Sequence, residues 1–242
     1  MEAIRIENLT KKYKDTLAVD RLNLSIKKGE LFSLLGVNGA GKTTTVKMLA
    51  GLTKPDGGEA FLNGKSVLKD ISKVKEIIAI SPQETAVAPA LSVKENLELI
   101  CGIYKFTKEK QDKKIKELSD ILGLQSVIGK KAGKLSGGFK RRLSIAMALI
   151  SEPQILFLDE PTLGLDVIAR SELWDIIRTL KGEVTIVLTT HYMEEAEALS
   201  DRIAIMKDGR LLICDTADKI KEYAETDNFE QAFIRVVKGE RL

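Results

Sequence analysis

The sequence predicts an α/β fold built on a parallel β-sheet, and two patterns along the chain carry this prediction. Short, almost continuous apolar runs stand at residues 77–80, 155–158 and 185–190. Runs of this length fit parallel strands that are buried on both faces. Residues 92–149 instead show apolar side chains at spacings of three and four, which is the period of a helix. Strands that alternate with helices in this way predict βαβ units.

The N-terminal part of the chain shows the different pattern of an antiparallel sheet. Leu22, Leu24 and Ile26 alternate with polar residues, as in a strand with one buried face. Asn63 and Gly64 stand between two strand-like stretches and favour a type I′ hairpin turn. We therefore expect an N-terminal antiparallel β subdomain beside the parallel core.

These patterns favour a single domain over residues 1–242. We expect its core in residues 1–83 and 152–215, a helical subdomain inserted at residues 84–151, and a short C-terminal tail at residues 216–242. A chain of this length can bury a sizeable hydrophobic core in one such domain.

The composition is that of an ordinary globular protein and argues against several classes. Apolar residues make up 44% of the chain and charged residues 30%, which is too apolar for a disordered protein. The net charge of +3, without a long basic block, gives no indication of a nucleic-acid partner. Cys101 and Cys214 stand far apart, so a reduced cytosolic setting fits better than a disulfide or zinc framework. We expect neither a signal peptide nor a transmembrane segment, so any membrane-spanning part would come from another chain.

Residues 36–43 read GVNGAGKT, which matches the phosphate-loop pattern of GxxxxGK followed by Ser or Thr in full. The segment lies between a strand-like run and a helix-like stretch, and this context favours a phosphate site over a plain glycine-rich turn. Glycines let the backbone wrap around phosphates, Lys42 supplies charge to the β- and γ-phosphates, and the Thr43 hydroxyl suits Mg²⁺. The expected ATP-binding residues of this loop are Gly36, Asn38, Gly39, Ala40, Gly41, Lys42, Thr43 and Thr44.

Two adjacent carboxylates follow the apolar run at residues 155–158. In open parallel sheets, ligands bind at the carboxyl ends of the strands, where Asp159 and Glu160 are expected to lie. Asp159 suits Mg²⁺ coordination, direct or through water, and Glu160 suits polarisation of the attacking water. A strand that ends in a solvated acidic turn is the alternative, and the phosphate loop makes the functional interpretation the stronger one.

Two further segments give the chain a resemblance to a known family. Residues 134–142 read KLSGGFKRR and residues 160–166 read EPTLGLD. With the phosphate loop and the acidic pair, they resemble the nucleotide-binding domain of ATP-binding-cassette (ABC) transporters in order and spacing over about residues 1–215. The resemblance implies a P-loop NTPase fold with a RecA-like parallel-sheet core. It also implies an ATPase that uses ATP and Mg²⁺.

The resemblance assigns roles to single residues as well. Tyr13 matches the aromatic residue that stacks on adenine; a surface tyrosine is the alternative. Gln83 matches the glutamine that links the Mg²⁺ and water site to the transmembrane partner; a polar loop residue is the alternative. His191, the only histidine, matches the switch histidine that contacts the γ-phosphate. With Lys42 and Glu160, Gln83 and His191 form the expected catalytic set, and Gln83 joins Thr43 and Asp159 as an expected metal ligand.

The segment LSGG carries a consequence for assembly. Ser136, Gly137 and Gly138 are expected at a helix N-terminus, whose free N–H groups suit an anion. In the family this motif completes the ATP site of a partner subunit, so the resemblance implies a head-to-tail pair with two ATP molecules between the subunits. We expect a homodimer, and a heterodimer is the alternative. Phe139 departs from the pattern, because the family usually has glutamine there. We expect activity to survive, since the proposed phosphate contacts do not need that side chain.

The resemblance further favours a transport motor. The chain is similar to bacterial exporter ATPases whose transmembrane permease subunits are separate chains, which places it at the cytoplasmic face of the membrane as a peripheral subunit. Cargo selection would then lie in the membrane subunit. A soluble ABC ATPase that regulates or remodels a non-membrane partner is the alternative.

Overall fold

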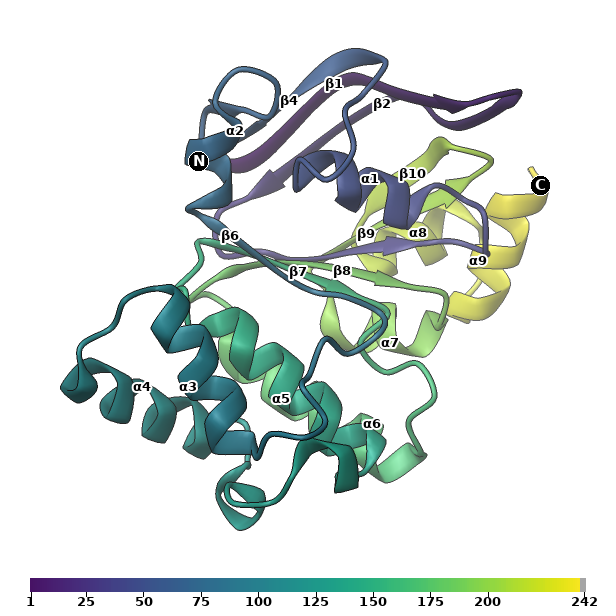
Figure 1. The fold of residues 1–242 in the computed structure, drawn as a ribbon. Helices are drawn as coiled ribbons and strands as arrows, with labels where there is room; N and C mark the ends of the chain where they lie inside the picture. Colours follow the sequence, from purple (N-terminus) through teal and green to yellow (C-terminus); the bar gives the residue numbers. More distant parts are fainter. Residues whose placement is uncertain (240–242) are drawn as a thin grey trace.

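The computed structural model describes residues 1–239 and confirms an α/β fold with two β-sheets and helices packed around them (Figure 1). The strands are β1 (Glu2–Tyr13), β2 (Thr16–Lys27), β3 (Leu31–Leu35), β4 (Gly57–Leu62), β5 (Lys65–Ser66), β6 (Ile78–Ser81), β7 (Ile155–Asp159), β8 (Thr185–Thr190), β9 (Arg202–Lys207) and β10 (Arg210–Asp215). The helices are α1 (Lys42–Leu49), α2 (Ile71–Lys75), α3 (Val93–Ile103), α4 (Lys108–Ile121), α5 (Gly137–Leu149), α6 (Val167–Leu180), α7 (Met193–Leu199), α8 (Ala217–Tyr223) and α9 (Phe229–Lys238), with short 3-10 turns at Gln125–Val127 and Ala132–Lys134.

The larger sheet has six strands in the order β10-β9-β3-β8-β7-β6. All neighbours pair in parallel except β10, which runs antiparallel to β9. Every residue of β3, β7 and β8 is buried, which explains why their sequences are almost continuously apolar. Because β3, β8 and β7 are neighbours and parallel, the segments that follow them leave the sheet side by side.

The smaller sheet is antiparallel, in the strand order β2-β1-β4-β5, as predicted for the N-terminal part. Leu22, Leu24 and Ile26 point into the core from β2, and the residues between them are more exposed. Asn63 and Gly64 form the turn between β4 and β5 with φ angles of 46° and 77°. A type I′ turn requires a positive φ at both central positions, so the predicted hairpin is confirmed.

The hydrophobic core lies in two layers, one on each face of the six-stranded sheet. Between the two sheets, α1 contributes Val46, Met48 and Leu49 to the first layer (Figure 1). On the opposite face, α3 to α6 pack their apolar side chains against the sheet, where they meet Leu156 and Leu158 of β7. Because α1 packs between the two sheets, the loop that precedes α1 has a fixed position.

Two helices of the second layer, α3 and α5, begin at serine caps. Ser92 accepts a hydrogen bond from the Glu95 backbone at the start of α3, and the Glu95 side chain accepts one in return. Ser136 caps α5 and accepts a hydrogen bond from the backbone N–H of Phe139. The two caps satisfy N–H groups that have no partner within the helix.

Residues 216–239 of the predicted tail form α8 and α9 (Figure 1). Phe229 and Phe233 of α9 are buried with Ile203 and Ile205 of β9 in a small third cluster. These residues therefore belong to the packed body of the domain. Residues 240–242 of the predicted tail lie outside the described residues.

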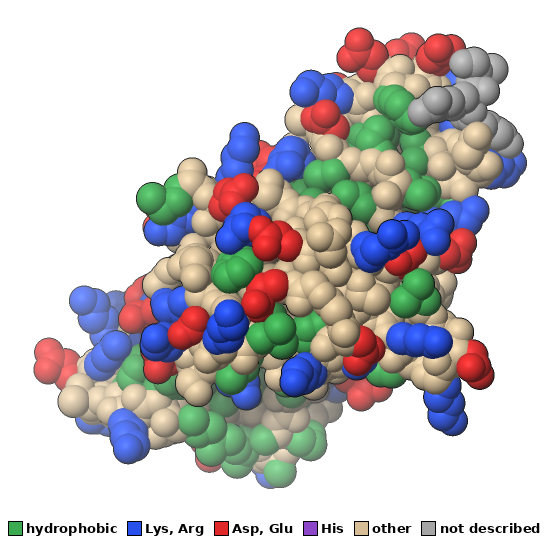
Figure 2. Space-filling view, turned by 90° about the horizontal axis from the view of Figure 1, so that it is seen from above, with side chains coloured by type: hydrophobic (Ala, Val, Ile, Leu, Met, Phe, Trp, Pro, Cys, Tyr) green, Lys and Arg blue, Asp and Glu red, His purple; other side chains and the backbone are tan. Residues whose placement is uncertain are grey.

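Charges of both signs are mixed over the face seen in Figure 2, which looks down on the side of the smaller sheet. Lys and Arg side chains alternate there with Asp and Glu side chains, so this face carries no extended patch of one sign. In the described part of the chain, residues 1–239, no helix has the length and apolar character that crossing a bilayer requires.

Candidate active site

The phosphate loop joins β3 to α1. Its glycines are required for two different structural reasons. Gly39 and Gly41 have φ angles of 83° and 100°, which side-chain-bearing residues rarely adopt. Gly36 has an ordinary φ, but a Cβ there would lie 2.4 Å from the backbone oxygen of Met206. The loop can therefore turn tightly against β9 and leave its N–H groups at the start of α1.

A cavity of about 600 Å³ lies over this loop and gathers much of the predicted site. It is lined by Thr16, Ala18, Asn38, Gly39, Ala40, Gly41, Lys42, Thr43, Thr44, Gln83, Glu160, Leu163 and His191. Four separate segments, around residues 38–44, 83, 160–163 and 191, thus meet at the carboxyl edge of the large sheet. Among the predicted residues, Tyr13, Gly36, Asp159, Ser136, Gly137 and Gly138 are not part of this lining.

Lys42 is a buried cation at the base of the cavity, with a side chain that is 5% exposed. Its ammonium group donates to the backbone oxygens of Gly36, at 2.7 Å, and Val37, at 3.3 Å. Burial lowers the pKa of Lys42, and the negative charges of Glu160 and Asp159 oppose this shift. The backbone carbonyls accept hydrogen bonds from this ammonium group but carry no net charge. An anion in the cavity would give it a directly bonded negative partner.

Glu160 lies between two basic side chains. One carboxylate oxygen is 4.0 Å from Lys42 Nζ, and the other is 3.2 Å from His191 Nδ1. The His191 nitrogen makes no hydrogen bond in this arrangement, so the pair is close without being aligned. Glu160 and His191 lie at the ends of the neighbouring strands β7 and β8, which is why residues 31 positions apart meet here.

Asp159 is held one residue earlier, on the last position of β7. Its Oδ1 accepts hydrogen bonds from Thr43 Oγ1, at 3.2 Å, and from the Thr189 hydroxyl of β8. Thr43 stands at the start of α1, so the phosphate loop and the acidic pair are joined through this contact. Thr43 and Asp159 together present a hydroxyl oxygen and a carboxylate oxygen as neighbouring ligands beside the cavity.

The LSGG segment lies at the start of α5. Ser136 and Gly137 are exposed, and Gly138 is buried so closely that a Cβ would lie 3.1 Å from Cβ of Ala169 in α6. Phe139 is half-buried against the helical layer, with the Arg142 guanidinium 5.3 Å from its ring centre. The side chain that replaces the usual glutamine is therefore partly used for packing.

Tyr13 lies at the exposed end of β1 and is 46% exposed. The Lys11 ammonium group is 5.3 Å from the centre of its ring. Thr16 and Ala18, the first residues beyond the β1–β2 turn in the cavity lining, place this end of the smaller sheet next to the phosphate loop.

Two buried charged residues support the site and were not predicted. Arg141 of α5 is 3% exposed and donates to backbone oxygens on both sides of the cavity. Glu195 of α7 is fully buried, accepts hydrogen bonds from Thr162 and Trp174, and keeps Oε2 without a hydrogen bond. Burial raises the pKa of Glu195. In the sequence, Arg141 is one of two adjacent arginines and Glu195 one of two adjacent glutamates, so nothing marks them.

The comparisons with known proteins agree with this arrangement. The family profile described as "ABC transporter" matches residues 19–163, which is more than half of the chain. A "Nod factor export ATP-binding protein I" of Burkholderia pseudomallei is 42% identical over 209 residues, 86% of this chain and 68% of the relative. The chain belongs to the ABC transporter family. It contains the ATP-binding cassette of that family, and the family relationship favours a transport role over that of a soluble ABC protein.

Other relatives are longer proteins, of which this chain matches only a part. "Probable multidrug ABC transporter ATP-binding protein YbhF" of Escherichia coli is 39% identical over 241 residues, and this chain spans 41% of its length. The human "ATP-binding cassette sub-family A member 2" is 47% identical over 216 residues, which are 87% of this chain and 9% of that protein. A second profile, described as "AAA domain, putative AbiEii toxin, Type IV TA system", covers only residues 130–197.

Solved structures of ABC cassettes share the fold over nearly the whole chain. The ADP- and Pi-bound post-hydrolysis dimer of the cassette MJ0796 has a TM-score of 0.79 at 28% identity, over 88% of this chain and 98% of that one. An "ATP binding subunit of ABC transporter" has a TM-score of 0.85 at 25% identity, over 97% of this chain and 99% of that one. The P-loop NTPase fold expected from the sequence is therefore confirmed.

Proposed function

We propose that this cassette hydrolyses ATP in the phosphate-loop cavity and that hydrolysis powers export through separate transmembrane subunits. The position of Glu160 carries the proposal. Its carboxylate is on the cavity wall, 3.2 Å from His191 and 4.0 Å from Lys42. A general base must reach a water next to the γ-phosphate, and Lys42 marks where that phosphate would bind.

Each predicted residue has a role in this proposal. Lys42 and the loop N–H groups bind the phosphates, and Tyr13 stacks on the adenine. Glu160 polarises the attacking water, and His191 donates to the γ-phosphate oxygens. Gln83, exposed at the cavity edge, senses the phosphate that is present or lost.

The residues beside the cavity fit a Mg²⁺ ion. Thr43 and Asp159 offer a hydroxyl and a carboxylate that are 3.2 Å apart, and Gln83 lines the same cavity with an amide oxygen. Mg²⁺ prefers oxygen ligands and is commonly held by one or two protein groups together with substrate phosphates. Residues 1–239 contain no cluster of three His, Cys, Asp or Glu side chains that could hold a metal, which fits a site completed by phosphates. When bound, the ion would neutralise charge on the β- and γ-phosphates.

A second copy of the chain completes the proposed site. Ser136 and Gly137 are exposed on the inserted helical subdomain, outside the lining of the chain's own cavity. Val167 and Ile168, next to Asp166, are 71% and 72% exposed, which is unusual for a pair of adjacent apolar residues. The proposed homodimer would cover these residues and place Ser136 and Gly138 of each subunit at the γ-phosphate of its partner.

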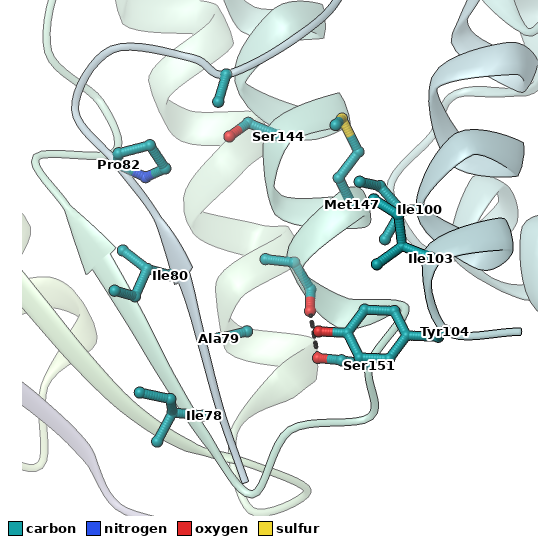
Figure 3. A pocket seen from close by; sticks show the side chains of 12 residues that line it. Ile78, Ala79, Ile80, Pro82, Ile100, Ile103, Tyr104, Ser144, Met147 and Ser151 are labelled. Carbon is teal, nitrogen blue, oxygen red and sulfur yellow. Dashed lines mark hydrogen bonds between the residues drawn. The ribbon is translucent and has the colours of Figure 1, made fainter. Parts of the chain in front are cut away.

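An apolar groove is the proposed contact with the transmembrane subunits. It holds about 330 Å³ between β6, α3 and α5, and Figure 3 shows Ile100, Ile103 and Tyr104 facing Ile80 and Met147 across it. Ile103 and Tyr104 are 66% and 50% exposed. The loop after β6 leads from this groove straight to Pro82 and Gln83, so a segment bound in the groove can respond to the state of the cavity.

The relatives support the proposed direction of transport and the proposed location. Their printed names concern multidrug transport and Nod factor export, which supports export for this chain. A subunit that binds transmembrane chains and uses ATP would lie peripherally at the cytoplasmic face of the membrane. In this proposal the membrane subunits select the cargo.

Hydrolysis is tested by Glu160→Gln in the purified protein. We expect ATP binding to persist, a closed dimer to accumulate, and turnover to fall by about 10²- to 10⁴-fold, the range for loss of a general base. Glu194→Gln is the matched control, because its side chain is 79% exposed and lines a different cavity, which shares His191 with the phosphate-loop cavity. If Glu160→Gln hydrolyses ATP at the wild-type rate, the base assignment is wrong.

Membrane coupling is tested by Ile103→Asp. We expect this variant to keep its basal ATPase activity and to lose co-purification with transmembrane chains from detergent extracts. Ile234→Asp is the control. Ile234 is also an exposed isoleucine, at 40%, and it lies on α9, which contributes no residue to the groove. Recovery of the wild-type protein only in soluble complexes would contradict the transport proposal.

A further inference from the structure

Arg141 is a buried arginine whose hydrogen bonds, among residues 1–239, go only to backbone carbonyls. Its guanidinium donates to the oxygens of Pro82, at 2.6 Å, Gln83, at 2.7 Å, and Glu160, at 3.2 Å. The residue is 3% exposed, and within residues 1–239 it takes part in no ion pair. Nothing in the proposed hydrolysis requires a charge at this position, so its three bonds need another explanation.

One of these bonds reaches a residue with a strained backbone. Glu160 has a φ of 45°, in the left-handed region that non-glycine residues seldom adopt. Its N–H donates to the backbone and side-chain oxygens of Thr189, at 3.0 and 3.1 Å, and its C=O accepts from Arg141. Such a conformation persists only where the surroundings determine it; here Thr189 accepts from the Glu160 N–H, and the Glu160 C=O accepts from both Arg141 and the Leu163 N–H.

The other two bonds reach the segment that carries Gln83. The carbonyls of Pro82 and Gln83 follow β6, whereas Glu160 follows β7. Arg141 itself lies one turn beyond Ser136 in α5. One side chain therefore connects the loop of the proposed sensor, the loop of the proposed base and the helix that begins with the LSGG segment.

We propose that Arg141 is a positioning residue for ATP hydrolysis, which holds the backbones of Glu160 and Gln83 in the geometry that the reaction needs. The inference rests on the proposed roles of these two residues. Among the residues that line the cavity, Arg141 bonds the backbones of Gln83 and Glu160, and it makes no hydrogen bond to Lys42 or to the phosphate loop, so the phosphate-binding part of the site does not depend on it. Its loss should therefore lower the turnover number and leave nucleotide affinity nearly intact.

The test compares Arg141→Gln and Arg141→Lys with Arg235→Gln in the full chain. Arg235 is the matched control, because it also donates to two backbone carbonyls, those of Ala224 and Glu225, at 2.7 and 2.9 Å, but in the C-terminal helices. Steady-state kcat and KM, the Kd of a fluorescent ATP analogue and the Tm are measured for each variant. Arg141→Lys keeps the charge with fewer donors, so it also serves if the glutamine variant does not fold.

For Arg141→Gln we expect kcat to fall about ten- to hundredfold, the effect of losing hydrogen bonds from a charged donor, with Kd within about threefold of wild type. Arg141→Lys should recover part of kcat. Arg235→Gln should keep kcat within about twofold of wild type.

Two results would overturn the proposal: kcat within about twofold of wild type in Arg141→Gln, or a fall in kcat matched by an equal loss of nucleotide affinity. The second result would mean a purely structural arginine. Failure of the proposed function is separate, since it would appear as wild-type turnover in Glu160→Gln whatever Arg141→Gln does.

Discussion

Replacing Lys42 with methionine isolates the charge that the phosphate loop offers to a nucleotide. Methionine keeps most of the length and the apolar stem of lysine and removes the ammonium group. That group is buried, donates at 2.7 and 3.3 Å to the loop carbonyls of Gly36 and Val37, and lies 4.0 Å from Glu160. It is thus placed inside the cavity, where a phosphate would be its partner.

The expected effect on ATP binding is large, and the effect on folding is small. Two unit charges about 4 Å apart interact with about 4 kcal/mol at an effective dielectric constant of about 20. At about 1.4 kcal/mol per factor of ten, this corresponds to a loss of affinity of about a thousandfold. Burial lowers the pKa of Lys42 even against the attraction of Glu160 and Asp159, so the charged form is disfavoured in the folded state. Removing the charge should therefore not reduce the stability of the nucleotide-free protein near neutral pH.

Thermal unfolding with and without Mg²⁺ and ATP measures both effects. A ligand at about 100 times its Kd stabilises a protein by about 2.7 kcal/mol, so the wild-type Tm should rise on addition of ATP. Lys42→Met should show an unchanged or higher Tm without ATP and no rise with it. Lys47→Met is the control, because Lys47 is exposed on the same helix. An equal ATP-dependent rise in Lys42→Met would refute the assignment of this lysine to the phosphates.

Three further predictions address the loop, the dimer and the buried acid. Gly41→Ala should cost about 1–3 kcal/mol of stability in urea unfolding. It should be worse than Gly39→Ala, because the added Cβ at residue 41 would lie 2.4 Å from a backbone oxygen of β2, whereas residue 39 has open space. In mixtures of Ser136→Ala with Lys42→Met chains, ATPase assays should recover at most one composite site per dimer, and equal activity in every mixture would argue against a site shared between chains. Burial raises the pKa of Glu195, so the stability it contributes is complete below its unfolded-state pKa and is lost as the pH rises through the folded-state value. Urea unfolding at about pH 5 and about pH 8 should therefore show Glu195→Gln gaining stability relative to wild type at the higher pH, and a pH-independent difference would contradict this.

The elements that follow from local patterns could be predicted from the sequence. Continuous apolar runs located β6, β7 and β8; every residue of β7 and β8 is buried, and strands buried on both faces favour apolar residues. The phosphate loop was recognisable from the sequence because its glycines are required by the local backbone conformation. Gly39 and Gly41 need positive φ angles, whatever the rest of the chain does.

The supporting contacts of the site could not be predicted in this way. Arg141 reaches Gln83 and Glu160 over 58 and 19 positions in the sequence, and Glu195 meets Thr162 over 33. Such contacts depend on strand order and on how α5 and α7 pack. No spacing rule within a single segment encodes them.

The sequence by itself determined which chemistry the chain can offer: the cation of Lys42, the oxygens of Thr43 and Asp159, and the carboxylate of Glu160. These are properties of residue types placed at strand ends and in a glycine-rich loop. The tertiary structure alone decided that Glu160 has a left-handed backbone and lies 3.2 Å from His191, with Arg141 on its carbonyl. Side-chain distances across a sheet edge come from the packing of whole layers, because parallel pairing of β7 with β8 brings together residues that are remote along the chain.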